Sequence, residues 1–374
     1  MRPLEGLFVL DFSTLLPGPL ATLLMAEAGA EVVKIEPPGR GEEMRAHTPK
    51  WGRDSASFAL LNRGKKSVAL DLKNSVDRAR LEPLVERADV LVEQFRPGVM
   101  ARLGLAYEAV ARVNPRIVYC SITGYGQQSP KRDVAAHDLN YIGDAGLLAL
   151  SMGDAARPVV PPALVADIAG GAYPAVLNIL LALEERRRTG RGRHLDVAMA
   201  DNLFPFMFWA MGQGHAFGAW PASGAARLTG GSARYALYPT KDGKVVTAAP
   251  LEQKFWDTFC DIIALEHDLR DDHRNSPATK ARVAELIAAE TADVWRARFA
   301  GRDCCCSIVA DVADALRDPH YVERGVFAHM LANPEGAIMP ALPVPLDPGF
   351  RAPPAATIAS PALGADNKHY VERS

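Results

Sequence analysis

Short apolar runs alternate with longer helical segments in the first half of the chain. Residues 7–12 and 30–36 have the apolar composition of short strands. Between them, residues 20–28 are typical of a helix, with Pro17 ahead of it and Gly29 at its end. A strand, a helix and a second strand in this order predict a β-α-β unit with parallel strands and a right-handed crossover.

The same alternation continues to about residue 199. Further strand-like runs are residues 68–72, 89–93, 117–122 and 194–199, with helical segments between them. This pattern predicts a large doubly wound (Rossmann-like) α/β domain, which we place at residues 1–218. Ligands of such sheets bind beyond the carboxyl ends of the strands. Lys73, Arg96 and the loop after Ile122 are therefore expected near a ligand.

The pattern changes after a stretch of small residues at 219–231. Two apolar runs flank Lys241-Asp242-Gly243, which predicts a β-hairpin. Helical segments follow at 252–264, 277–289 and 291–299. These elements predict a smaller α+β domain at residues 219–310. The proline-rich segment 311–374 has no core of its own, so we expect it to return to the large domain.

Composition limits the function classes. The 374 residues carry 42 basic and 44 acidic side chains, a net charge of −2. A nucleic-acid-binding domain would be strongly basic, so that class is disfavoured. No transmembrane helix or signal peptide is expected. Five cysteines, an odd number, indicate reduced thiols and a cytoplasmic location. Cys304-Cys305-Cys306 has no partner at zinc-like spacing, so no metal site is expected.

Two polar side chains stand out as candidates for chemistry. Asp167 ends an apolar run and is expected to cap the helix that follows. Gly170-Gly171 would leave that helix start open to a ligand's carbonyl group. His137 precedes Asp138, a possible partner for one nitrogen of the imidazole ring.

The chemistry of this pair has two interpretations. If the side chains meet across a thioester, His137 and Asp167 can remove and return the proton on its α-carbon, which is a two-base epimerisation. Alternatively, Asp167 is a nucleophile that attacks the thioester and carries the acyl group as an anhydride. That second reaction is CoA transfer, and it needs no histidine at position 137.

Several stretches carry a resemblance to a known family. They are residues 15–19 (LLPGP), 29–36 (GAEVVKIE), 70–73 (LDLK), 95–98 (FRPG), 123–127 (TGYGQ) and 189–192 (TGRG). Over nearly its whole length the chain resembles the family III CoA-transferases, such as carnitine and formyl-CoA transferases. This family also contains the 2-methylacyl-CoA racemases. Residues 137–141 (HDLNY) and 251–256 (LEQKFW) look like racemase segments, whereas Pro239 replaces a residue that is often charged in racemases.

The resemblance carries expectations for the site and the assembly. Asp167 matches the acyl-accepting aspartate of the transferases, and His137 matches the histidine that the racemases add. Lys73 and Arg96 match positions that contact CoA, and Asp138 and Tyr141 are expected beside it. The family implies an interlocked homodimer, acyl-CoA as the substrate and no prosthetic group. A 2-methylacyl-CoA racemase is the favoured interpretation; the alternatives are an acid:CoA transferase and an inactive CoA-binding scaffold.

Overall fold

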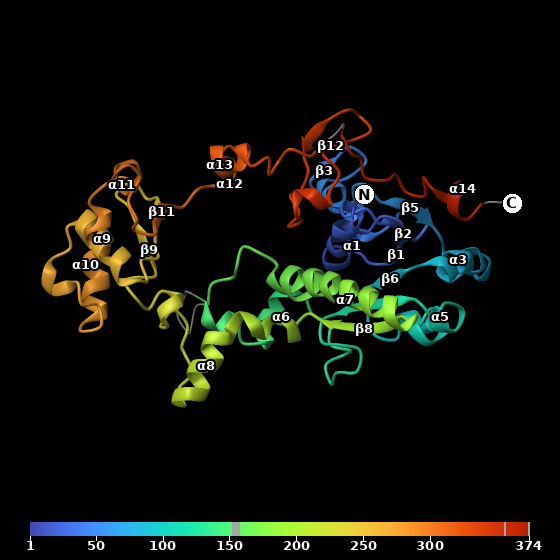
Figure 1. Cartoon of the computed structure of the whole chain (residues 1–374), viewed down its shortest axis with the longest axis horizontal. Helices are drawn as coiled ribbons and strands as arrows, with labels where there is room; N and C mark the ends of the chain where they lie inside the picture. The colour runs from blue at the N-terminus through green and yellow to red at the C-terminus, as the bar shows by residue number, and fades with distance from the viewer. Residues whose placement is uncertain (152–157, 355–356, 373–374) are drawn as a thin grey trace. The chain divides into compact units, whose positions relative to one another are not determined.

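The chain forms two compact units, each with its own sheet and core (Figure 1). The computed structural model describes residues 1–151, 158–354 and 357–372. Unit 1 comprises Met1–Ala145, Ala163–Phe204 and Pro319–Ser374; unit 2 comprises Gly146–Pro162 and Pro205–Asp318. These bounds differ from the predicted borders at residues 218 and 310. Ser151 belongs to unit 2, where the Ser223 hydroxyl donates a 2.8 Å hydrogen bond to its carbonyl oxygen.

Unit 1 is built on a six-stranded parallel sheet with strand order β5-β2-β1-β6-β7-β8. The strands are β1 (Phe8–Asp11), β2 (Glu31–Glu36), β5 (Lys66–Ala69), β6 (Val90–Glu93), β7 (Val118–Thr123) and β8 (Arg193–Ala198). The predicted α/β class is confirmed. The strand order reverses between β1 and β6, so the crevice beyond their carboxyl ends is the place where such sheets bind ligands.

Helices pack on both faces of this sheet. The helices of the first part of unit 1 are α1 (Pro17–Glu27), α2 (Ala56–Asn62), α3 (Ser75–Arg87), α4 (Val99–Arg102), α5 (Tyr107–Val113), α6 (Asp138–Asp144) and α7 (Tyr173–Thr189). Phe8 and Leu10 face a core that they share with α3 and α5. Val9, which lies between them on β1, is fully buried on the opposite face. Helices α1 and α7 pack against each other and against the strands.

One helix in the described part of the chain is apolar and long enough to span a membrane by composition alone. It is the segment Ala166–Thr189, formed by the π-helical turn η3 (Ala166–Ala172) and α7. Ala175 and Ile179 are fully buried, and the segment contacts β7 and β8. A helix that fills a protein core meets the same length criterion.

Unit 2 has a three-stranded antiparallel sheet with strand order β11-β10-β9. Its main elements are α8 (Phe208–Phe217), β9 (Ala236–Pro239), β10 (Val245–Ala248), α9 (Gln253–Ile263), α10 (Ser276–Ala288), α11 (Ala292–Phe299), β11 (Cys306–Ile308) and α12 (Val312–Ala315). Its core is centred on Trp256, Phe259 and Trp295. The predicted hairpin and the three predicted helices after it are present.

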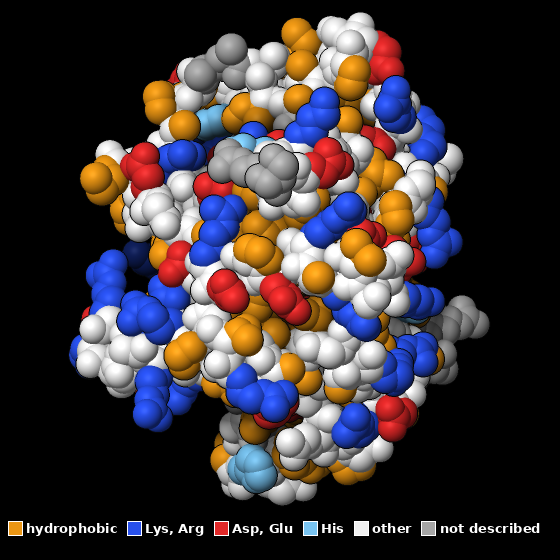
Figure 2. All heavy atoms as spheres, turned by 90° about the vertical axis from the view of Figure 1, so that its right-hand side faces the viewer, with side chains coloured by type: hydrophobic (Ala, Val, Ile, Leu, Met, Phe, Trp, Pro, Cys, Tyr) orange, Lys and Arg blue, Asp and Glu red, His pale blue; other side chains and the backbone are white. Residues whose placement is uncertain are grey.

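The C-terminal segment packs on unit 1. It contains α13 (Pro319–Glu323), α14 (Asn367–Tyr370) and the hairpin of β12 (Met330–Ala332) and β13 (Ile338–Pro340). Elsewhere in unit 1, two short strands, β3 (Lys50–Trp51) and β4 (Asp54–Ser55), pair with each other. The Asn367 side chain accepts a 2.8 Å hydrogen bond from the Ala69 backbone at the sheet edge. Arg351 pairs with Glu27 at 2.8 Å. Leu331 and Ala341 of this segment also share a small buried apolar cluster with Ala59. On the face shown in Figure 2, basic, acidic and apolar side chains are interspersed.

Candidate functional site

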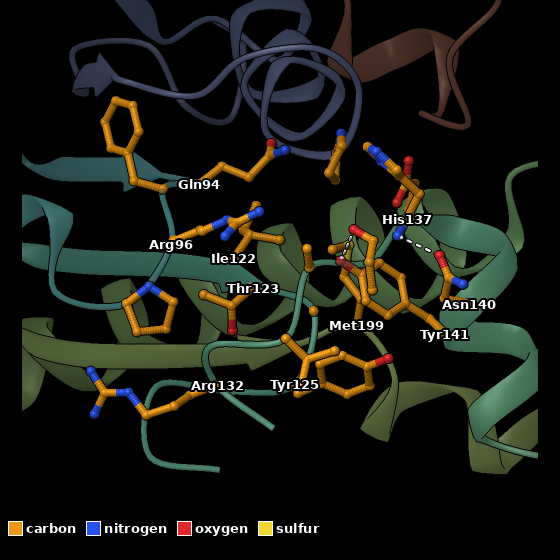
Figure 3. A pocket seen from close by; sticks show the side chains of 18 of the residues that line it. Gln94, Arg96, Ile122, Thr123, Tyr125, Arg132, His137, Asn140, Tyr141 and Met199 are labelled. Atoms are coloured by element: carbon orange, nitrogen blue, oxygen red, sulfur yellow. Dashed lines mark hydrogen bonds between the residues drawn. The ribbon is translucent and has the colours of Figure 1, made fainter. Parts of the chain in front are cut away.

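A cavity of about 390 Å³ lies in unit 1 at the predicted edge of the sheet. Its walls come from the loops after β1, β6 and β7, from the start of α6 and from η3 (Figure 3). His137, Asp167, Arg96 and Tyr141 all line it. The fold therefore brings four of the predicted site residues to one place, although 30 positions separate the first two in the sequence.

His137 is held through its backbone. It has an extended conformation and directly precedes α6. Its backbone N–H donates a 3.0 Å hydrogen bond to the Asn140 side-chain oxygen, as Figure 3 shows. The His137 side chain lies at the cavity wall. The side chain is exposed, so it can contact a ligand in the cavity.

Asp167 lies inside a helical turn and not at its cap. The prediction of a capping role is wrong, because the π-helical turn begins at Ala166 and Val165 occupies the cap position. π-Helical turns are rare and often occur at functional sites. Burial raises the pKa of Asp167 to about 6, with a further contribution from the charge of Asp138, while His137 acts to lower it. Both candidate side chains line the same cavity.

The glycine pair after Asp167 serves packing. A Cβ atom on Gly170 would lie 2.5 Å from the backbone oxygen of Met199, and one on Gly171 would lie 3.1 Å from Pro17. Both glycines are buried. The expected opening for a ligand carbonyl at this turn is therefore filled by protein.

Tyr141 supports the loop that precedes His137. Its hydroxyl group donates a 2.8 Å hydrogen bond to the carbonyl oxygen of Ala136. Its ring fills the space that Gly124 leaves by having no side chain, and it packs edge-on against Tyr125 at 5.2 Å. Burial raises the pKa of Tyr141 to about 12, with a further contribution from nearby Asp167. The Tyr141 hydroxyl group is therefore already used in a hydrogen bond within the protein.

Asp138 and Lys73 are placed differently from the other predicted residues. Asp138 is 5% exposed, and its Oδ1 accepts a 2.9 Å hydrogen bond from the backbone N–H of Asp167. Asp138 is thus hydrogen-bonded to Asp167, whereas the sequence suggested the His137 ring as its partner. Lys73 follows β5 and is not among the residues that line the cavity. Contact of either residue with CoA stays a prediction.

A buried ionic network fixes the loop after β1. Leu15, which lines the cavity, has a left-handed backbone conformation with φ of 61°. Its N–H donates a 2.9 Å hydrogen bond to Glu42, and the Lys34 ammonium donates one of 2.6 Å to the Ser13 carbonyl oxygen. Lys34 and Glu42 are almost completely buried and lie 3.5 Å apart. This ionic network was not predicted from the sequence. The presence of Lys34 within the apolar run of β2 was the signal that could have indicated it.

Gln94 and Arg132 also line the cavity and were not predicted. Gln94 directly follows β6, so its place at the carboxyl end of a parallel strand was the signal that could have identified it. Its side-chain oxygen accepts a 2.9 Å hydrogen bond from the N–H of Gly18 at the start of α1. Within residues 1–151, 158–354 and 357–372, no group of three or more His, Cys, Asp or Glu side chains is arranged to hold a metal ion.

A second, smaller cavity of about 220 Å³ adjoins the first and shares Arg96 and Arg132 with it. Glu93 lines it with 3% exposure, and its carboxylate accepts a 2.8 Å hydrogen bond from the Phe95 N–H. Burial raises the pKa of Glu93 to about 7. The residue thus anchors the loop that carries Arg96.

Comparisons with known proteins agree on the family. The profile of CoA-transferase family III matches residues 4–367. The chain is 34% identical to the acetyl-CoA:oxalate CoA-transferase of Acetobacter aceti over 356 residues, covering 91% of this chain and 88% of that protein. It is 32% identical to the alpha-methylacyl-CoA racemase of Homo sapiens over 328 residues, covering 87% and 82%. The structure superposes on a CAIB/BAIF family protein from Brucella suis with a TM-score of 0.83 and 27% identity, covering 98% and 97%.

Proposed function

This chain belongs to CoA-transferase family III, and within that family we propose that it epimerises the α-carbon of a 2-methylacyl-CoA. It is an enzyme of the superfamily that joins these transferases with the racemases and acts on acyl-CoA thioesters. The observation that supports epimerisation is the shared cavity of His137 and Asp167. In the proposed complex, the thioester lies between these two titratable side chains.

The proposed reaction is a balanced two-base proton transfer. One residue removes the proton from the α-carbon, and the electron pair of the C–H bond delocalises onto the thioester oxygen as an enolate. The other residue then delivers a proton to the opposite face of the carbon. Asp167 suits both roles near neutral pH because burial raises its pKa to about 6. His137 is the partner for the other face.

Deuterium exchange tests this proposal. Each enantiomer of a 2-methylacyl-CoA is incubated with the enzyme in D₂O without a second carboxylic acid, and the α-position is followed by NMR or mass spectrometry across several acyl chains. We expect deuterium to enter the α-position while the substrate racemises. Absence of exchange in every substrate would rule out epimerisation of these thioesters. Asp167→Asn is the matched control, because it keeps the shape of the side chain and removes the base.

CoA transfer is the second candidate, supported by the identity to an oxalate CoA-transferase. The Asp167 carboxylate would attack the thioester carbonyl, the C–S bond would break, and CoA would leave as a thiolate. An acyl anhydride would remain on Asp167. Hydroxylamine converts such an anhydride to a hydroxamate, and an added carboxylic acid receives CoA as a new thioester. Detection of either product distinguishes CoA transfer from epimerisation. An inactive scaffold would bind CoA and give neither product.

We further propose that the enzyme is a homodimer and that Lys73 and Arg96 contact CoA. The dimer proposal is supported by exposed apolar side chains along α7, including Leu177 and Leu181, which are 58% and 60% exposed. Exposed apolar groups on one helix face are typical of an interface. Light scattering after size-exclusion chromatography should give twice the mass of the chain; a monomer would contradict the proposal.

A further inference from the structure

The Asp138 carboxylate connects the two elements that carry the candidate pair. Asp138 is the first residue of α6, next to His137, and it is 5% exposed. Its Oδ1 accepts a 2.9 Å hydrogen bond from the backbone N–H of Asp167 in η3. A single buried side chain thus ties the segment of one candidate residue to the backbone of the other.

The charge of Asp138 acts on the same residue. A carboxylate in the first turn of a helix is favoured by the helix dipole. A second carboxyl group nearby is harder to ionise, because like charges repel in a partly buried site. Burial and then the Asp138 charge raise the pKa of Asp167, and His137 opposes them. Tyr141 and Arg96 line the same cavity as Asp167. Asp167 raises and Arg96 lowers the pKa of Tyr141.

We propose that Asp138 is a positioning residue that fixes the backbone of Asp167 and, by its negative charge, sets the proton affinity of that carboxyl group. The proposal rests on the proposed function, in which Asp167 is the reacting carboxyl group. Asp138 lies outside the cavity lining and is not itself a catalytic residue. The two effects are separable, because one depends on an oxygen acceptor and the other on charge.

Two substitutions separate them. Asp138→Asn keeps a side-chain oxygen that can accept the N–H of Asp167 and removes the charge. Asp138→Ala removes both. Asp144→Asn is the matched control: Asp144 ends the same helix, its side chain is 42% exposed, and it binds Lys131 at 2.7 Å. Urea unfolding of each variant checks that it is folded.

The deciding measurement is the titration of Asp167 itself. The carboxyl carbons of aspartate are labelled with ¹³C in the full-length protein, and the Asp167 signal is assigned by its loss in Asp167→Asn. We expect Asp138→Asn to lower the titration midpoint of Asp167 by about one pH unit. Asp144→Asn should leave it in place. An equal midpoint in wild type and both asparagine variants would overturn the charge part of the proposal.

Kinetics test the positioning part. With the reaction that the enzyme is found to catalyse, we expect Asp138→Asn to shift the acidic limb of the kcat profile downward in pH with little change in KM. Asp138→Ala should in addition lower kcat about tenfold at the optimum. Equal kcat values for the two variants at their optima would overturn the positioning role. The NMR titration needs no turnover, so its result stands apart from the success or failure of the proposed function.

Discussion

The hydroxyl group of Tyr141 is hydrogen-bonded at 2.8 Å to the carbonyl oxygen of Ala136, the residue directly before His137. The bond closes a loop between the first turn of α6 and the backbone that enters it. Asn140 binds the His137 N–H from the same turn. The side chains of Tyr141 and Asn140 therefore both hold the backbone around His137.

Tyr141→Phe removes only the hydroxyl group of this contact. We expect the rate constant of α-proton exchange to fall about 2- to 10-fold, the value of one hydrogen bond, with KM nearly unchanged. Tyr125→Phe is the control, because the Tyr125 hydroxyl binds Asp144 at 2.8 Å, away from Ala136. Steady-state exchange kinetics give the comparison. Equal losses in both variants would argue against a specific role for Tyr141.

Gly124→Ala tests the space that Tyr141 occupies. The added Cβ would overlap the Tyr141 ring, so the ring must move and the loop with it. We expect a loss of about 1–3 kcal/mol in the free energy of unfolding, together with reduced exchange activity. Gly143→Ala, in the same helix as Tyr141, meets nothing within 4 Å and should be neutral or slightly stabilising. Urea denaturation of the pair measures the difference, and similar values would refute the steric argument.

His137→Ala separates the two candidate reactions. Loss of the second proton carrier should reduce racemisation by at least about 10²-fold, whereas any CoA transfer through Asp167 should remain largely intact. Both activities are measured on one preparation, by chiral analysis of the thioester and by transfer to an added carboxylate. If the two fall together, His137 has a structural role. Asp167→Asn should abolish both.

The raised pKa of Asp167, about 6, predicts a specific pH dependence. Above that pH the carboxylate predominates; below it the group is protonated and cannot act as base or nucleophile. The exchange rate of the enantiomer that gives its proton to Asp167 should fall about tenfold per pH unit once the pH is well below that pKa. Initial rates for each enantiomer, measured from roughly pH 4 to pH 8, test this dependence. Flat profiles for both enantiomers would contradict it.

Glu93→Gln addresses stability rather than catalysis. The pKa of Glu93 is raised from 4.5 to about 7 in the folded protein. Ionisation of Glu93 therefore destabilises the folded state progressively as pH rises through that interval. The glutamine side chain of the variant does not ionise, and its amide oxygen can still accept the hydrogen bond from the Phe95 N–H. Between roughly pH 5 and 8.5 the variant should gain about 1–3 kcal/mol relative to wild type. Unfolding curves at both pH values measure the gain; Glu184→Gln, with an exposed side chain, should show none.

Local sequence patterns determined most of the elements in both units. Apolar runs of four to six residues became β1, β2, β6 and β7, and a turn with Gly243 joined β9 to β10. These patterns are readable because burial on a sheet or a helix repeats with a fixed period along the chain. The position of the cavity at the carboxyl ends of the strands could be predicted because the strands were expected to be parallel. His137 and Asp167 were identified from their residue types and from the family resemblance.

The surroundings of those residues were decided by the tertiary structure. The sequence placed Asp138 beside His137, but folding gave its carboxylate to the backbone of Asp167, 29 positions away. It also turned Gly170 toward Met199 and buried Lys34 beside Glu42 beneath the loop of Leu15. Hydrogen-bond partners and pKa shifts depend on which distant groups share a desolvated space. A linear pattern reports the faces of helices and strands, whereas that shared space exists only once the elements have packed.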